Sequence, residues 1–188
     1  HPAPQDPPLR TAGLATSPNV DWCEDHRLET AAVNITGAIN VAEIAARQRN
    51  YVVQLGSGCI FEGDETTVYT EEDEPNFFGS FYSQTKAICE GVLKEIPNVC
   101  ILRIRMPLSQ RPHPKNLLNK LLQYEKILNL PNSVTVIEDF LPFLERVIEK
   151  RITGVLNAVN PGIYHHRDLL ELYREHVDPS RHFSFIGL

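Results

Sequence analysis

No run of apolar residues in this sequence approaches the roughly 18 residues that a membrane-spanning helix requires, and the N-terminus has no signal-peptide pattern. Cysteine is scarce: Cys23, Cys59, Cys89 and Cys100 have neither the paired spacing of a zinc site nor the density of a disulfide scaffold. We therefore expect free thiols, no metal, no membrane contact and a cytoplasmic location. Any one of these cysteines can also be a small buried apolar residue.

Basic residues are in the minority, with 18 Lys and Arg against 24 Asp and Glu and a net charge of -6. This balance disfavours nucleic acid as a partner and favours a small-molecule ligand. A hydrophobic content of 42% in 188 residues is typical of one folded domain. Residues 1–11 are rich in proline and are expected to form a disordered tail, and because the chain begins with His1 we expect a segment upstream.

Apolar residues recur at helical spacing in some segments, and β-branched runs lie between them. Helices are expected over residues 25–50, 80–95, 140–150 and 165–176, with a loop-and-helix unit at 114–127. Strands are expected over residues 51–58, 99–106 and 154–160, with a short one at 133–139. This alternation indicates an α/β fold with a parallel sheet covered by helices on both faces, which binds ligands at the carboxyl ends of its strands.

Tyr82 and Lys86 are four residues apart in the segment YSQTK, so they project from one face of the expected helix. The preceding strand ends in Gly56-Ser57-Gly58, which can present a hydroxyl beside that helix. Together these groups suit hydride transfer to a ketone, because the developing alkoxide needs a proton donor and a hydrogen-bond partner. Tyr82 would donate the proton, Lys86 would favour the tyrosinate, and Ser57 would orient the carbonyl. The alternative is a solvated helix face.

The order of Asn34, Ser57, Tyr82 and Lys86 resembles the extended short-chain dehydrogenase/reductase superfamily, which has a Rossmann-like fold. The sequence is most similar to the bifunctional nucleotide-rhamnose synthase/epimerase-reductase family, from about residue 12 to about residue 177. The resemblance is carried by PNVDWCEDH, GCIFEG, EEDEPNFFGSFYSQTKA and LRIRMPLS, at residues 18–26, 58–63, 71–87 and 102–109. It implies conversion of a nucleotide-4-keto-6-deoxyhexose to nucleotide-L-rhamnose, by 3,5-epimerisation followed by 4-ketoreduction with NADP or NAD as cofactor.

The resemblance assigns the epimerase step to Cys59 and Lys120, which would remove and return protons on opposite sides of the sugar. Ser57 and Cys59 are two residues apart, so both side chains could face one sugar ring. Lys120 lies in NLLNKLLQY, which can also be an amphipathic helix with an exposed lysine.

Further site residues follow from the same resemblance. Asn34 would relay protons through water, although it can also be a polar residue tolerated within a helix. A sugar-pocket role is implied for Asn19, Asn76 and Phe78, which can equally shape loops. Arg105 is expected to bind the cofactor as part of a basic cluster with Arg103 and Arg111 that could meet a diphosphate, and the alternative is surface ion pairing.

The sequence departs from the family in one respect: it has no G-x-x-G-x-x-G turn to bind the cofactor pyrophosphate. Residues 12–188 are therefore expected to form a Rossmann-like domain without its first βαβ unit, with substrate-binding elements at about 107–135 and 161–188. We expect weak cofactor binding and impaired activity in this chain alone. Two other hypotheses are a nucleotide-4-ketosugar reductase without epimerase activity and a non-catalytic regulatory or binding subunit. Superfamily analogy suggests a homodimer formed through the helices at 25–50 and 80–95.

Overall fold

The computed structural model describes residues 19–64 and 66–187. The predicted disordered tail at residues 1–11 lies outside the described residues. The chain forms two compact units. The first contains the described residues up to Glu62 together with Thr70–Arg103 and Val147–Asn157, and the second contains Gly63–Tyr69, Ile104–Arg146 and the residues from Ala158 onward.

The predicted helix at residues 25–50 is present, but it is not one regular α-helix. Helix α1 (Val20–Asp25) precedes it, and the helix itself consists of α2 (Arg27–Ala31), the π-helical segment η1 (Ala32–Gly37) and α3 (Ala38–Arg47). The side chain of Asn19 accepts hydrogen bonds from the first backbone N–H groups of α1, which fixes the start of that helix. A π-helical turn inside an α-helix often marks a functional position, and this one contains Asn34.

The sheet of the first unit contains β1 (Val52–Ser57), β2 (Val99–Ile104) and β6 (Gly154–Asn157), in the order β1-β2-β6. β2 and β6 are parallel, with Cys100 paired to Gly154 and Arg103 paired to Asn157. Helix α4 (Phe81–Leu93) follows the loop after β1, and Ser80 caps its N-terminus. These elements confirm the predicted strands and the predicted helix at 80–95, with slightly shorter limits.

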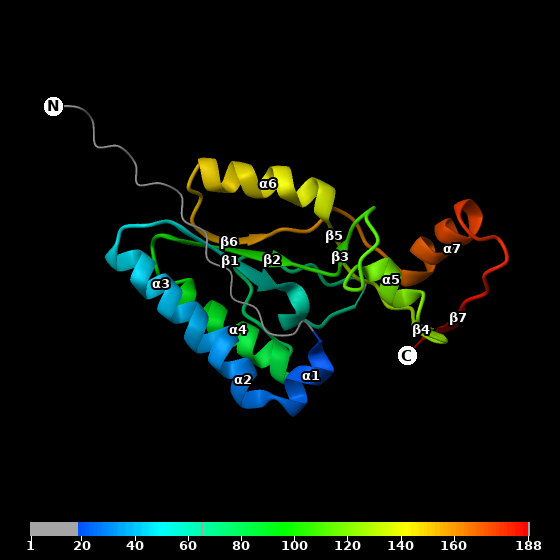
Figure 1. Ribbon diagram of the computed structural model, residues 1–188, viewed down its shortest axis with the longest axis horizontal. Coiled ribbons are helices and arrows are strands. Elements are labelled where there is room, and N and C mark those ends of the chain that lie inside the picture. Colours follow the sequence, from blue (N-terminus) through cyan, green and yellow to red (C-terminus); the bar gives the residue numbers. More distant parts are fainter. Residues whose placement is uncertain (1–18, 65, 188) are drawn as a thin grey trace. The chain divides into compact units, whose positions relative to one another are not determined.

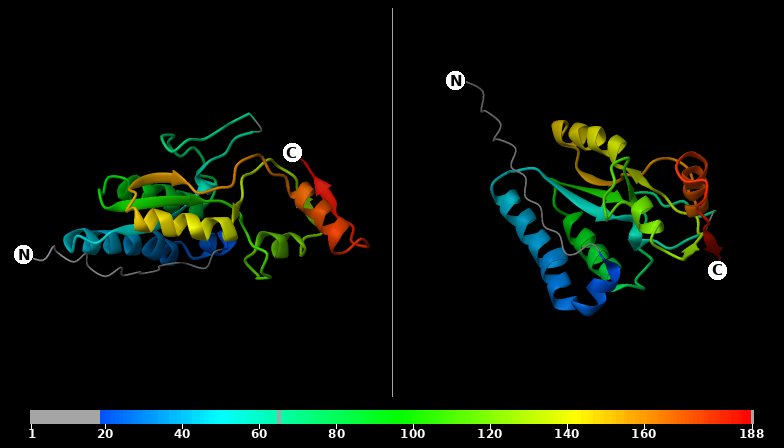
Figure 2. Two further views of the ribbon diagram at one scale, coloured as in Figure 1. Left: turned by 90° about the horizontal axis from the view of Figure 1, so that it is seen from above. Right: turned by 45° about the vertical axis from the view of Figure 1, so that its right-hand side comes forward.

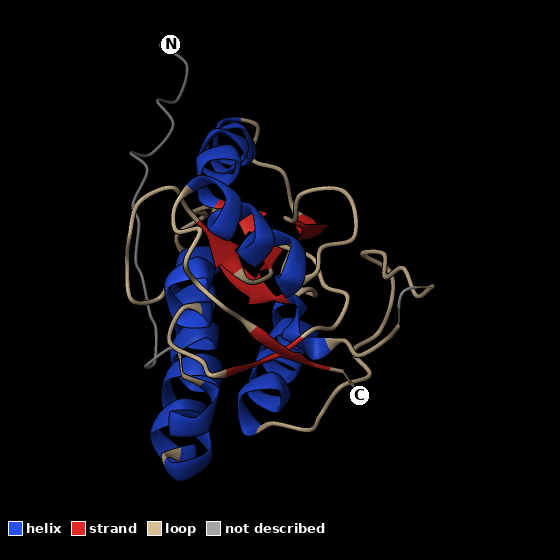
Figure 3. Cartoon of the chain, turned by 90° about the vertical axis from the view of Figure 1, so that its right-hand side faces the viewer, coloured by secondary structure: helices blue, strands red, loops and turns tan. Residues whose placement is uncertain are grey.

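The core of the first unit lies between the sheet and helices α3 and α4, which run side by side (Figure 1). Its buried members are aliphatic side chains and one thiol: Ala38, Ala42, Cys89, Leu93, Val99 and Ile101. Figure 3 shows helices in blue lying directly against the red strands. The four cysteines remain thiols, three of them buried, as the sequence predicts. This packing fixes α4 against β1, the two elements that carry the predicted catalytic residues.

Gly56 sits where β1 and β2 approach closely, which gives a testable difference between two glycines. A Cβ atom at Gly56 would lie 2.9 Å from the Ile101 side chain and 3.4 Å from the Leu102 carbonyl oxygen. We expect Gly56→Ala to destabilise the fold by about 1–3 kcal/mol through overpacking. Gly91 lies in α4 with open space around it, so Gly91→Ala should stabilise the fold by about 0.5–1 kcal/mol. Urea unfolding of both variants measures the two changes in the free energy of unfolding. Equal changes would contradict the close packing of β1 against β2 at Gly56.

The second unit contains two small parallel sheets rather than an extension of the first sheet. β3 (Pro107–Leu108) pairs with β5 (Thr135–Val136), and β4 (Lys126–Leu128) pairs with β7 (Ser184–Ile186). The parallel sheets and the helices beside them confirm the predicted α/β fold. β3 begins at Pro107, directly after the strand predicted at residues 99–106, and the strand predicted at 133–139 is short because helix α6 (Ile137–Glu149) begins at Ile137.

The helices of the second unit are α5 (Leu117–Leu121) and α7 (His166–His176), together with most of α6. Figure 2 shows α7, in orange, beside the β4–β7 pair. Leu117, Leu121, Ile127 and Leu170 form a core that joins α5, β4 and α7. Among residues 19–64 and 66–187, no helix is long and apolar enough to cross a membrane.

Candidate active site

The carboxyl end of β1 places Ser57 and Cys59 next to each other. Ser57 is 4% exposed, and its Oγ accepts a hydrogen bond of 3.1 Å from the Cys59 backbone N–H. This bond begins the short 3-10 helix η2 (Gly58–Ile60). Because one lone pair of the Ser57 oxygen is occupied by Cys59, its O–H group remains to be donated to an acceptor such as a ketone oxygen.

Tyr82 and Lys86 lie one turn apart on α4, as the sequence predicts. The Lys86 Nζ donates a hydrogen bond of 2.7 Å to the carbonyl oxygen of Leu55, two residues before Ser57 in β1. This contact joins the Tyr-Lys helix to the strand that carries the hydroxyl. Burial lowers the pKa of Lys86, and the nearby Cys89, Glu90 and Cys59 act in the opposite direction.

The lowered pKa of Lys86 predicts how stability depends on pH. Burial disfavours the charged ammonium, so the folded state loses the Lys86 proton below the ordinary value of 10.5 while the unfolded state still binds it. The free energy of unfolding should therefore rise, relative to a Lys86→Met variant, as the pH increases through the folded pKa toward 10.5. Urea unfolding at neutral pH and near pH 10.5 measures this difference. If the free energy of unfolding varied with pH in the same way in both proteins, the lowered pKa of Lys86 would be contradicted.

Ser83 fixes the Cys59 backbone from the other side. Ser83 is 1% exposed, and its Oγ donates a hydrogen bond of 2.7 Å to the carbonyl oxygen of Cys59. Ser80 caps α4 by accepting the Ser83 N–H at 3.1 Å, and it donates its own hydroxyl to the Ser83 oxygen. The N-terminal turn of α4, with Tyr82 on it, is thereby attached to the segment that follows Ser57.

Asn34 is buried in η1 and contacts the same helix. Its Nδ2 donates a hydrogen bond of 3.1 Å to the Thr85 hydroxyl, which in turn donates to the Tyr82 carbonyl oxygen at 2.8 Å. The structure thus brings Asn34 to the Tyr-Lys helix through Thr85. The water relay implied for Asn34 by the family resemblance stays a prediction.

The predicted sugar-pocket residues have structural contacts of their own. The Asn76 side chain accepts the Glu62 N–H and donates to the Glu62 carbonyl oxygen, both at 2.9 Å. The Asn19 oxygen caps α1 by accepting the Asp21 N–H at 2.9 Å. Phe78 is exposed, with 53% of its surface accessible. Their sugar-binding role stays a prediction.

The structure does not support the basic cluster at the end of β2. Arg103 is buried at 3% exposure, and its Nη2 lies 2.6 Å from a carboxylate oxygen of Glu90, so its guanidinium is not at the surface. In the second unit, the Nε of Arg105 donates to the Asn132 side-chain oxygen at 2.7 Å, and Arg111 is exposed. The alternative interpretation, that Arg103 forms an ion pair at the surface, is wrong because Arg103 is buried and pairs with Glu90 of α4. The cofactor role of Arg105 stays a prediction.

Lys120 lies on α5 in the second unit, where its side chain is exposed. Ser57, Cys59, Tyr82, Lys86 and Asn34 all belong to the first unit. The structure therefore brings five of the six predicted catalytic residues into one unit, and the epimerase role of Lys120 stays a prediction.

Sequence reasoning missed Ser83, Thr85 and Glu90. Ser83 and Thr85 lie between Tyr82 and Lys86 in the segment SFYSQTK, whose density of hydroxyl groups was a signal for hydrogen bonding between elements. Glu90 lies one turn after Lys86 on the buried face of α4, at 5% exposure. A carboxylate at such a position requires a partner of opposite charge, which was the available signal for the Arg103 ion pair.

The fold defines a Rossmann-like class of α/β protein, and its first unit contains the Ser, Tyr and Lys side chains described above. Structures of that class match with high similarity, including dTDP-4-dehydrorhamnose reductase from Bacillus anthracis in complex with NADP, with a TM-score of 0.79 at 18% identity over 92% of this chain and 63% of that chain. At this identity the match shows the fold. The RmlD substrate binding domain family matches residues 12–167, and the chain belongs to that family.

Two relatives are similar in sequence as well. The bifunctional dTDP-4-dehydrorhamnose 3,5-epimerase/dTDP-4-dehydrorhamnose reductase of Arabidopsis thaliana is 42% identical over 179 residues, which is 92% of this chain and 60% of that protein. The crystal structure of the UDP-rhamnose synthase of Acanthamoeba polyphaga mimivirus has a TM-score of 0.85 and 31% identity, over 89% of this chain and 61% of that chain. The chain thus spans less than two thirds of the length of either relative.

Proposed function

We propose that this chain carries the catalytic half of a nucleotide-sugar 3,5-epimerase/4-ketoreductase of L-rhamnose biosynthesis, located in the cytoplasm. The observation that carries the proposal is the contact between Lys86 and the Leu55 carbonyl oxygen, at 2.7 Å. It holds the helix with Tyr82 against the strand that ends at Ser57. The proposed substrate is a nucleotide-4-keto-6-deoxyhexose, the substrate class named for the relatives.

In the reduction step, the chain's own residues act on the 4-keto oxygen. A bound NADPH or NADH supplies the hydride to C4. Tyr82 transfers its phenolic proton to the oxygen as the C=O double bond becomes a single bond, and the charged Lys86 stabilises the tyrosinate that remains. Ser57 donates its hydroxyl hydrogen to the same oxygen, because its acceptor side is occupied by Cys59.

The described residues fit one end of the proposed cofactor. Tyr82 and Lys86, one turn apart on α4, would offer a hydroxyl and an ammonium group to the nicotinamide ribose. After β1 the chain enters the three-residue helix η2, which is too short to provide a helix N-terminus for a pyrophosphate. Within the part of the chain that the structure describes, we assign NAD(P)H contacts to these two residues, and the cofactor contact of Arg105 stays a prediction.

In the epimerase step, Cys59 and Lys120 exchange protons at C3 and C5, the carbons beside the ketone. A thiolate removes a proton from one face, and the ammonium group of Lys120 returns one to the other face. Cys59 suits this role because its peptide is held at the N–H by Ser57 and at the carbonyl by Ser83.

The experiment is to supply the full-length gene product with a nucleotide-4-keto-6-deoxyglucose and NADPH. We expect NADPH oxidation and a nucleotide-L-rhamnose, identified by NMR from the inverted configuration at C3 and C5. A reduced product with both centres unchanged would favour a 4-ketosugar reductase without epimerase activity. No NADPH binding by the full-length product would favour a non-catalytic subunit.

Cys59→Ala and Lys120→Ala should separate the two steps. Each variant should lose roughly 100-fold or more of the solvent-deuterium incorporation at C3 and C5, since each removes a proton-transfer group. Reduction of a substrate that is already epimerised should stay within a few-fold of wild type. Lys115→Ala removes another exposed lysine of the second unit and serves as the control. Unchanged deuterium incorporation in both variants would exclude these residues from epimerisation.

The possible homodimer also stays a proposal. It would use the helices at residues 27–47 and α4, which expose large apolar side chains to solvent. These are Leu28, Ile44, Ile88 and Val92.

A further inference from the structure

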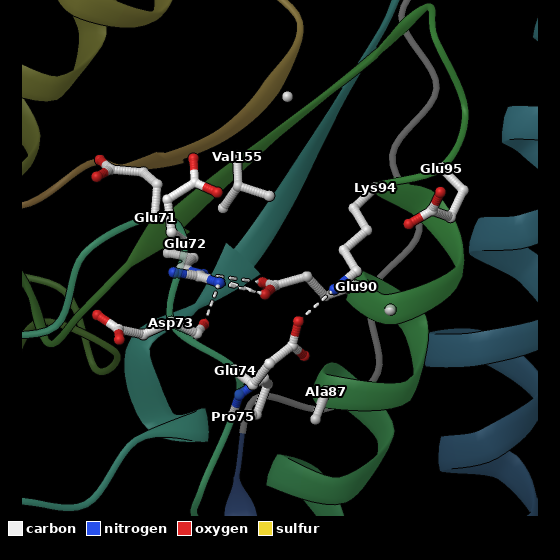
Figure 4. Close-up of a pocket in the computed structure, with 13 residues that line it drawn as sticks. Glu71, Glu72, Asp73, Glu74, Pro75, Ala87, Glu90, Lys94, Glu95 and Val155 are labelled. Atoms are coloured by element: carbon white, nitrogen blue, oxygen red, sulfur yellow. Dashed lines mark hydrogen bonds and ion pairs between the residues drawn. The ribbon is translucent and has the colours of Figure 1, made fainter.

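Arg103 is a buried cation whose hydrogen-bonding groups reach beyond its ion pair. Its Nη2 lies 2.6 Å from Glu90, and both side chains are almost inaccessible, at 3% and 5% exposure. Nη1 donates to the carbonyl oxygen of Thr70 at 3.0 Å, and Nη2 donates to that of Asp73 at 3.4 Å. Figure 4 shows Glu90 of α4 opposite the loop at Asp73. One side chain of β2 therefore holds a loop that is about 30 residues earlier in the sequence.

The loop closes on itself in a way that presents those two carbonyl groups. The Asp73 carboxylate accepts the Thr70 N–H at 2.6 Å and the Thr70 hydroxyl at 2.8 Å. These bonds, with a smaller contribution from the charge of Arg103, hold the pKa of Asp73 below its usual range. The turn is thus formed by its own side chains, and Arg103 attaches it to the sheet.

The acidic side chains of the loop are engaged in further contacts. Glu71 accepts the Asn157 N–H at the end of β6, at 2.9 Å, and Glu74 pairs with Lys94 of α4 at 2.7 Å. Glu71, Glu74 and Lys94 line a cavity of about 350 Å³ (Figure 4). Glu71 therefore attaches the loop to β6, and Glu74 attaches it to α4. Glu90 of α4 pairs with Arg103 of β2, which attaches the loop through the Thr70 and Asp73 carbonyl groups.

The other end of the loop is attached to the candidate active site. The backbone N–H groups of Asn76 and Phe77 both donate to the Ile60 carbonyl oxygen, at 3.1 and 3.0 Å. Ile60 directly follows Cys59. The ring of Phe61 lies under the Arg103 guanidinium, 4.9 Å from its centroid. Arg103 therefore contacts both the start of the loop and the segment that continues from Cys59.

We propose that Arg103 is a positioning residue that holds the loop of residues 70–78 in place to bind the nucleotide sugar. The inference rests on the proposed function, because it concerns the loop that carries Asn76 and Phe78. Arg103 does not touch the reacting atoms. It acts by fixing the Thr70 and Asp73 carbonyl groups, so the loop is ordered before substrate arrives and less binding energy is spent on ordering it.

The geometry requires arginine rather than any cation. A guanidinium presents donors in several directions from one plane, so it can serve Glu90, Thr70 and Asp73 together. A lysine at this position would retain a single compact charge that can pair with Glu90 but would not span both loop carbonyl groups. Arg103→Lys therefore separates the loop contacts from the ion pair.

The test measures amide hydrogen exchange and steady-state kinetics of the full-length gene product. In Arg103→Lys we expect amides of residues 70–78 to exchange at least about tenfold faster, since two hydrogen bonds are lost, while amides of α3 and β1 change little. KM for the nucleotide sugar should rise about tenfold with kcat changed less than about threefold. Arg47→Lys makes the same substitution in an exposed ion pair with Glu43 and should change neither quantity.

Three results would overturn the inference. They are unchanged exchange in the loop of the Arg103→Lys variant, exchange that accelerates equally throughout the first unit, and a fall in kcat with KM constant. Wild-type protein provides a second measurement if the variant does not fold. Its loop amides at 70–77 should be protected from exchange. Exchange at the intrinsic chemical rate would refute the proposal that Arg103 holds this loop in place. Failure of the proposed function would abolish the kinetic readout but would leave the exchange results unaffected.

Discussion

Tyr82→Phe should lower ketoreduction by the full-length gene product by roughly 100- to 10,000-fold, the range that a positioned general acid contributes. The phenylalanine ring keeps the shape of the side chain but has no proton to give to the ketone oxygen. Ser57 would still donate a hydrogen bond, and Lys86 would still be held at Leu55, so substrate binding should change little. The loss should therefore appear in kcat rather than in KM.

The measurement is NADPH oxidation at saturating nucleotide-ketosugar, with thermal unfolding recorded on the same samples. Tyr124→Phe removes an exposed phenol of the second unit and is the matched control. Unfolding midpoints of both variants should match wild type. Reduction by the Tyr82 variant at the original rate would remove the basis for the whole assignment.

Arg103→Ala and Glu90→Ala should each destabilise the fold by about 3–5 kcal/mol, because each leaves an uncompensated charge at a buried position. The two side chains are 3% and 5% exposed and 2.6 Å apart. Arg103→Ala should be the more severe change, since the Thr70 and Asp73 carbonyl groups also lose a donor. These effects follow from the ion pair itself and do not depend on the enzyme activity.

Urea unfolding of single and double variants provides the measurement. Arg103→Met combined with Glu90→Leu removes both charges and should cost less than the sum of the two alanine variants. Arg47→Ala breaks an exposed pair with Glu43 and should cost at most about 1 kcal/mol. An Arg103→Ala cost as small as that of Arg47→Ala would show that the buried pair is not important for stability.

The local elements of the first unit could be predicted from the sequence because their signals are local. The run before Ser57 is β-branched and ends in glycine, and the segment after Ser80 has both a helix cap and helical spacing. Tyr82 and Lys86 could be placed on one helical face for the same reason. Four residues of spacing determine their geometry whatever the rest of the chain does.

Contacts that depend on distant residues could not be predicted in this way. Arg103 and Arg105 alternate in the strand predicted at residues 99–106, which suggested a common exposed face, but the position of Arg103 is set by Glu90, 13 residues earlier. The π-helical turn at Asn34 has no sequence pattern of its own, because it depends on how the helix packs on Thr85. Strands β3, β4 and β7 of the second unit could not be predicted, because strands of two or three residues carry too few side chains for a periodic signal.

The peptide group of Cys59 is bonded to residues of both proposed steps, epimerisation and reduction. Its N–H is held by the hydroxyl that serves reduction, and its carbonyl oxygen is held by Ser83, the neighbour of the proton donor. A substitution that shifts the thiol therefore also reorients the serine and strains the start of α4. Protein engineers who seek an epimerase without reductase activity, or the reverse, should replace the reacting atoms themselves and leave this backbone link intact.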